Sequence, residues 1–132
     1  MAVERSRGEG TTLEEGNGPE DTREEEADED DGTYGEKLSY FIDMLRSENV
    51  GWRWKAAEAL ARLGDLRAVG PLIRALDDED WRVRQKAAWA LGYLGDPRAI
   101  VPLRRAYRDE REGVQEIIME ALAMINEQMA RQ

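Results

Sequence analysis

Apolar residues between Val50 and Asn126 recur at helical spacing, and the whole pattern repeats after 31 residues. Neighbouring apolar positions are three and four residues apart, the spacing of one buried helical stripe. The first stripe of each unit comprises Trp52, Ala56, Ala59, Leu60 and Leu63, then Val83, Ala87, Ala90, Leu91 and Leu94. The second comprises Val69, Leu72, Ile73 and Leu76, then Ile100, Leu103, Ala106 and Tyr107. Each unit is therefore predicted to be a pair of helices, and repeated pairs of this length stack into an α-solenoid.

Turn residues divide each pair of helices at the same place. Gly64 and Gly95 follow the first stripe, where a helix commonly ends in a left-handed residue. Asp65 and Asp96 come next as N-cap candidates, and Pro97 suits the first position of the following helix. The stripes continue into both flanks. We therefore expect an all-α fold of about six helices, at roughly 36–46, 50–63, 67–77, 81–94, 98–108 and 113–129.

Charge separates the chain into two parts. Residues 1–34 carry 13 acidic and 3 basic residues, a net charge of −10, whereas residues 35–132 carry 16 of each sign. The segment 24–32 is almost entirely acidic and offers no apolar surface to bury. We therefore predict a disordered acidic tail over residues 1–34 and a repeat domain over residues 35–132. Such a tail promotes solubility or contacts a basic surface electrostatically.

Several function classes are disfavoured by the composition. No apolar segment near Met1 resembles a signal peptide and none approaches the roughly 20 residues of a membrane span, so we expect a cytoplasmic protein. The chain has no His and no Cys, which excludes imidazole catalysis, thiolate chemistry and most transition-metal sites. The acids at 77–80 could hold a hard cation, but capping of the next helix and pairing with Arg53, Arg82 or Arg84 is the stronger interpretation. We expect no enzymatic activity, no cofactor and no metal.

The run from Ala87 to Leu103, AAWALGYLGDPRAIVPL, resembles the short HEAT repeat of the phycobilisome-lyase type. The Val-Arg pair of that motif corresponds to Val83-Arg84, and to Trp52-Arg53 in the preceding unit. The resemblance covers about residues 36–126 and implies a HEAT-like α-solenoid. Proteins with such repeats include scaffolds, bilin lyases and their chaperones, iron hydroxylases and some DNA glycosylases. The hydroxylases bind iron through His-Glu pairs, which this chain lacks.

Candidate binding residues form a first group on the second helices. The resemblance implies that these helices line an inner, concave side whose outward positions contact partners. These positions carry Arg74, Arg105 and Arg108, and Arg67, Arg98, Arg104 and Arg111 lie near them. The arginine ridge is defined as Arg74, Arg98, Arg104, Arg105 and Arg108. The ridge suits an acidic protein partner, or solvated pairs with the loop acids. Nucleic acid is disfavoured, because the repeat domain has no net positive charge and the tail repels phosphate.

A second group, the aromatic stripe, comprises Trp54, Trp89 and Tyr93 on the first helices. Trp89 and Tyr93 are four residues apart, so they share a helical face and should be at least partly exposed. An interface role and a partly buried role are equally open for the stripe. Trp52 and Trp81, by contrast, are predicted to lie in the core between units.

These observations predict a non-catalytic HEAT-repeat scaffold that binds another protein. The alternative is an accessory or chaperone-like subunit related to bilin lyases, which would need an aromatic groove with arginines for the propionates. A further hypothesis is a weak, salt-sensitive contact between the acidic tail and the arginine ridge.

Overall fold

The computed structural model describes residues 31–110 and 113–132, and every regular element in these two ranges is helical. The longer helices are α2 (Asp31–Met44), α3 (Val50–Leu63), α5 (Trp81–Leu94), α6 (Ile100–Asp109) and α7 (Gln115–Ala130). The shorter elements are α4 (Val69–Ala75) and the 3-10 turns η3 (Leu66–Ala68) and η4 (Pro97–Ala99). The predicted all-α stack is therefore confirmed.

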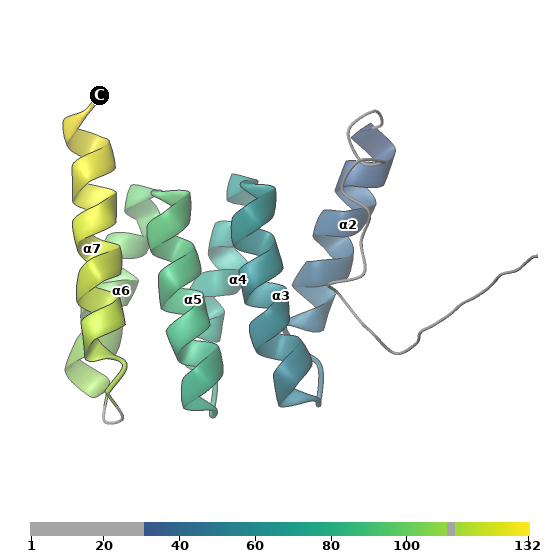
Figure 1. Ribbon diagram of the computed structural model, residues 1–132, viewed down its shortest axis with the longest axis horizontal. Coiled ribbons are helices and arrows are strands. Elements are labelled where there is room, and N and C mark those ends of the chain that lie inside the picture. The colour runs from purple at the N-terminus through teal and green to yellow at the C-terminus, as the bar shows by residue number, and fades with distance from the viewer. Residues whose placement is uncertain (1–30, 111–112) are drawn as a thin grey trace, which may run out of the picture.

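The helices form two layers (Figure 1). Helices α3, α5 and α7 stand side by side and form the outer layer, whereas α4 and α6 lie behind them and form the inner layer. Helix α2 packs against α3, and α2 and α7 occupy opposite ends of the stack. In sequence register α2 corresponds to α4 and α6. The chain thus starts the stack with an inner-type helix and ends it with an outer-type helix.

Capping residues set the helix ends at the same positions in each unit. Gly64 and Gly95 have φ angles of 72° and 73°, the left-handed conformation expected at these two positions. The side chains of Asp65 and Asp96 accept hydrogen bonds from the backbone N–H two residues further on, which confirms both N-caps.

The predicted boundaries differ from the structure in two respects. Each second helix is split into a 3-10 turn and an α-helix, because Pro71 and Pro102 lack the N–H that would bond to the carbonyl four residues back. Helix α2 begins at Asp31, earlier than expected, and ends at Met44. The prediction of a disordered tail falls mainly on residues 1–30, which lie outside the described residues.

The core lies between the two layers and follows the predicted stripes. Leu60, Leu72, Leu91 and Leu103 are completely buried, and most other stripe positions are buried or half-buried. Small residues bring the outer helices into close contact. At Gly92 an added Cβ would lie 2.8 Å from the Cβ of Ala121, so α5 and α7 meet without an intervening side chain.

The core prediction is wrong for Trp81, whose side chain is 43% exposed. Trp81 is the first residue of α5 and precedes Val83, where the buried stripe begins. Trp52 is half-buried and lies outside the main core cluster. Ala106 and Tyr107 are half-buried as well and pack against the edge of the core cluster.

Candidate protein-binding site

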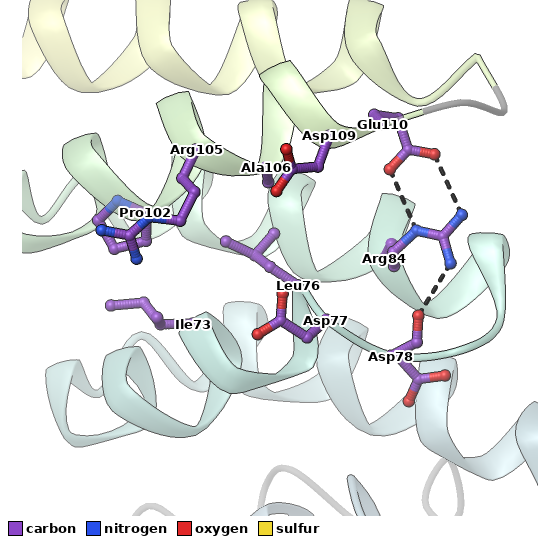
Figure 2. Close-up of a pocket in the computed structure, with 10 residues that line it drawn as sticks. All are labelled: Ile73, Leu76, Asp77, Asp78, Arg84, Pro102, Arg105, Ala106, Asp109 and Glu110. Atoms are coloured by element: carbon purple, nitrogen blue, oxygen red, sulfur yellow. Dashed lines mark hydrogen bonds and ion pairs between the residues drawn. The ribbon is translucent and has the colours of Figure 1, made fainter.

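A groove of about 460 Å³ separates the two inner helices, α4 and α6 (Figure 2). Ile73 and Leu76 of α4 form one apolar wall, and Pro102 and Ala106 of α6 form the other. Charged residues surround this apolar strip: Asp77, Asp78, Arg84, Arg105, Asp109 and Glu110. An apolar strip bordered by charges of both signs can accept an apolar side chain and orient it through its polar neighbours.

One end of the groove is held by Arg84, which reaches in from α5. Its Nε and Nη2 donate to the two carboxylate oxygens of Glu110, both at 3.1 Å, and its Nη1 donates to the backbone oxygen of Asp78 at 2.8 Å. Figure 2 shows the guanidinium between these two partners. The bidentate geometry fixes the orientation of both charges, so Arg84 and Glu110 brace the groove.

The same arrangement occurs one unit earlier. Arg53, which lies 31 residues before Arg84, donates from Nε and Nη2 to the carboxylate of Asp78 at 2.9 and 3.1 Å. Its Nη1 donates to the backbone oxygen of Ser47 at 2.8 Å. The pairing of Arg53 with a loop acid is thus confirmed. The next position in register is Gln115, whose amide donates to the backbone oxygen of Tyr107 at 2.8 Å.

Three charged groups of the groove have no ion-pair partner among the described residues. They are Asp77, Asp109 and Arg105, and all three are exposed. The sequence interpretation assigned the acids at 77–80 to capping of the next helix and pairing with arginines, and Asp77 does neither among the described residues. In the structure Asp78 and Asp80 make those local contacts instead. Only the packing of α4 beside α6 shows that Asp77 and Asp109 border one groove.

The structure does not bring the whole arginine ridge together. Arg74, Arg104, Arg105 and Arg108 are exposed and have no ion-pair partner among the described residues, but of these only Arg105 lines the groove. Arg98 is bound locally: it contacts the Asp96 carboxylate at 2.7 Å and donates to the backbone oxygen of Leu66 at 3.3 Å.

Local arginine contacts also change the acidity of the capping aspartates. The guanidinium of Arg82 donates to Asp80 and lowers the pKa of that carboxyl from 3.8 to about 2. Arg67 and Arg98 lower the pKa of Asp65 and of Asp96 in the same way, by side-chain hydrogen bonds. These carboxylates therefore stay ionised at neutral pH and stabilise the starts of the helices that they cap.

The aromatic stripe forms a cluster on the outer layer. Trp89 and Tyr93 of α5 are stacked, with ring centroids 5.5 Å apart and an interplanar angle of 24°. The Lys86 ammonium lies 5.7 Å from the Trp54 ring centroid and 5.3 Å from that of Trp89. Trp54 and Trp89 are half-buried against the core, whereas Tyr93 is 55% exposed. The cluster is thus distinct from the groove, which lies on the inner layer.

Within 31–110 and 113–132 no group of three or more acidic, His or Cys side chains is placed to hold a metal ion. None of the helices in these ranges is both long and apolar enough to cross a membrane.

The two-layered stack of helix pairs defines an α-solenoid repeat protein. The chain belongs to the HEAT repeat family, whose repeats match residues 38–123, more than half of its 132 residues. No curated protein matches the chain. HEAT repeats generally mediate contacts between proteins. An open groove between the inner helices α4 and α6 is consistent with this family.

Proposed function

We propose that this chain is a non-catalytic scaffold that binds a segment of another protein in the groove between α4 and α6. The observation that carries the proposal is the combination of an apolar strip with three exposed charges that have no ion-pair partner within residues 31–110 and 113–132. Ion pairs inside the protein occupy Asp78 and Glu110, whereas Asp77, Asp109 and Arg105 are exposed to a ligand. Groups of this kind orient a partner and determine its specificity.

The chemistry of the groove defines the partner segment. An apolar side chain would cover Ile73 and Pro102, and removal of this surface from water supplies affinity. A carboxylate of the partner would pair with Arg105, and with Arg74 at the corresponding position of α4. This contact is the acidic component expected from the arginine ridge. A cationic side chain of the same segment would lie between Asp77 and Asp109.

The residue types present support a binding role rather than catalysis. The chain has neither His nor Cys, and two of the groove carboxylates, Asp78 and Glu110, are held in ion pairs with Arg53 and Arg84. Nothing in the groove resembles a nucleophile activated by a base.

The alternative, an accessory role in bilin attachment, has less support. Its basis is the resemblance of the repeats to the phycobilisome-lyase type and the exposed edge of the aromatic stripe. A bilin site would require aromatic walls with arginines, but the residues that line the groove include no aromatic ring. Titration with a bilin, followed by visible absorbance, tests this role, and a saturable shift that Trp89→Ala removes would favour it.

The test of the main proposal uses matched charge reversals. Arg105→Glu alters the groove, while Arg131→Glu makes the same change at the C-terminal end of α7, away from it. Proteins captured from host lysate by the wild-type chain are compared with those captured by each variant. We expect a specific partner to be retained by Arg131→Glu and lost with Arg105→Glu. Equal capture by all three chains would refute a role for the groove.

A further inference from the structure

Helix α7, which forms one end of the stack, has an uncharged side that points away from α5. The 31-residue repeat aligns α7 with α3 and α5 and shows which side of α7 points away from α5. That side carries Gln115, Met119, Leu122, Ala123 and Asn126, none of which is charged. Met119, Ala123 and Asn126 on this side are exposed. Met119 is 56% exposed, whereas Ala88 at the same position of α5 is completely buried. An uncharged helical side is unusual in a chain with 36% charged residues, and it has the composition of a packing surface.

Helix α3, at the opposite end of the outer layer, has a partly exposed surface that is complementary to the uncharged side of α7. On α3 the positions directed away from α5 carry Trp52, Lys55, Ala59 and Leu63, all half-buried. The corresponding residues Val83 and Ala90 of α5 are completely buried, because α3 packs against them. Within the protein, neighbouring outer helices pack through two different surfaces. At the ends of the stack, α7 presents one of these surfaces and α3 presents the other.

The order of helix types makes these ends fit each other. Among the described residues, the first helix, α2, is of the inner type, and the last helix, α7, is of the outer type. We infer that a second copy of this chain stacks head to tail on the first, so that its α2 pairs with α7 and its α3 packs beside α7. The helices of two chains would then continue one uninterrupted alternation of outer and inner types.

The outer contact across such a junction repeats one that the structure already contains. Ala61 of α3 and Ala90 of α5 correspond in register to Gly92 and Ala121, which lie in close contact between α5 and α7. At the junction, Ala123 of the first copy corresponds to Gly92, and Ala59 of the second copy corresponds to Ala121. The pair is therefore alanine with alanine, as between α3 and α5, and allows the same close approach.

The charges of the outer layer match as well. Within the protein, Glu58 of α3 pairs with Lys86 of α5 at 3.8 Å. The corresponding residues at the junction are Glu120 and Lys55 of the second copy, again one acid and one base. Met119 replaces the smaller Ala57 beside this pair, and its flexible side chain can lie along the lysine stem.

The inner layer gives an independent match. In the groove between α4 and α6, Asp77 in the turn after α4 and Arg105 of α6 have opposite charges. One unit further the corresponding residues are Arg108 of α6 and Asp43 of the second copy's α2, opposite in charge again. Both are exposed and have no ion-pair partner among the described residues. The junction would thus also form a further groove of the same type.

The same charges disfavour a two-fold symmetric dimer in which outer layer meets outer layer and inner layer meets inner layer. Such a dimer would place Arg108 near Arg108 and Glu120 near Glu120. A head-to-tail junction places each of these beside an opposite charge. Because this contact uses different surfaces on the two copies, it leaves one surface of each kind open and propagates into longer chains.

Engineered cysteines test the arrangement directly, because the chain has no native Cys. A chain with both Ala59→Cys and Ala123→Cys is oxidised with diamide and separated without reductant. We expect a ladder of disulfide-linked dimers, trimers and longer species, whereas Ala123→Cys alone should stay monomeric. Cross-linked dimers from Ala123→Cys alone, or no cross-linking of the double variant, would overturn the head-to-tail arrangement.

A charge exchange provides the second test. Asp43→Arg and Arg108→Asp should each weaken self-association several-fold in sedimentation equilibrium, and the chain with both changes should regain wild-type association. Arg74→Asp, a reversal on the inner layer away from both ends, serves as the control and should not alter association. A wild-type chain that remains monomeric up to millimolar concentration, or a double variant as weak as the single ones, would refute the junction.

Discussion

Single polar side chains decide where the helices of this protein start. Asp65, Asp80 and Asp96 each cap a helix and accept side-chain hydrogen bonds from an arginine two residues later. A capping aspartate in this arrangement contributes to stability only while it is ionised, because the arginine contact favours the charged form. Acid should therefore weaken the helix starts before it affects the apolar core.

Asp80→Asn should reduce the dependence of stability on pH in acid. The pKa of Asp80 in the folded protein is about 2, below its ordinary value of 3.8, so the carboxylate stabilises the fold above about pH 4 and loses this effect as the pH falls towards 2. Asparagine still caps the helix but does not titrate. Thermal unfolding between pH 2 and 5 should show a shallower slope for Asp80→Asn than for the wild type.

Arg82→Gln is the matched variant, because it removes the side-chain hydrogen bonds that lower the pKa of Asp80. Its pH profile should also be shallower than that of the wild type. An Asp80→Asn profile that coincides with the wild type would contradict the assigned role of the Asp80 carboxylate.

Gly92→Ala should destabilise the protein, although alanine is normally the better helix former. The added Cβ would lie 2.7 Å from the Cα of Ala121, and backbone cannot rotate away as a flexible side chain can. We expect a loss of about 1–3 kcal/mol in the free energy of unfolding. Gly70→Ala is the control, because its nearest neighbour is the end of the Arg74 side chain at 4.0 Å, and it should be neutral or slightly stabilising. Denaturant unfolding measures the stability of both variants. A Gly92→Ala variant more stable than Gly70→Ala would contradict the close packing of α5 against α7.

At the scale of elements, buried arginines connect helices that short loops alone would not hold in place. Arg53 joins the end of α2 to the end of α4 through the Ser47 backbone oxygen and the Asp78 carboxylate, and Arg84 does the same between α4 and α6. Gln115 keeps the carbonyl contact but carries no charge to pair with a further acid. These contacts set the spacing of the inner helices, and hence the width of the groove.

Arg53→Met should destabilise the fold by about 2–4 kcal/mol, because it leaves the nearly buried Asp78 carboxylate without its partner. Arg53→Lys should recover little of this loss, since an ammonium cannot reproduce the bidentate contact and reach the Ser47 carbonyl as well. Denaturant unfolding of Arg53→Met, Asp78→Asn and the double variant forms a cycle. The double variant should lose less than the sum of the single losses, and strict additivity would show that the pair is not coupled.

The sequence correctly predicted features that depend on residues close together in the chain. The 31-residue register predicted the buried leucines, the left-handed glycines and the aspartate caps, because each depends on neighbours at fixed spacing. It failed for Trp81, since exposure at a helix start depends on which neighbouring helix extends past it. It also missed the groove acids. Whether Asp77 or Asp78 receives an arginine depends on how one unit is rotated against the next.

At the scale of the whole molecule, stability depends on contact between successive units. Leu91 is completely buried between the layers, so Leu91→Asp should cost roughly 4 kcal/mol or more, most of the stability of a small domain. Loss of one unit removes packing from both neighbours, and the whole stack should unfold. Val101→Asp, at an exposed apolar position of α6, should melt like the wild type. A cooperative melt of Leu91→Asp near the wild-type midpoint would contradict the two-layered stack.

The central claim is that the inner layer, rather than the aromatic stripe, receives the protein partner. Site-specific photo-crosslinking in the host tests it most directly, with a photoreactive amino acid placed either at Arg105 in the groove or at Tyr93 on the outer layer. Both positions are exposed, so labelling and folding are matched. The account predicts that position 105 captures a discrete partner and that position 93 does not. Capture from position 93 with none from position 105 would contradict it.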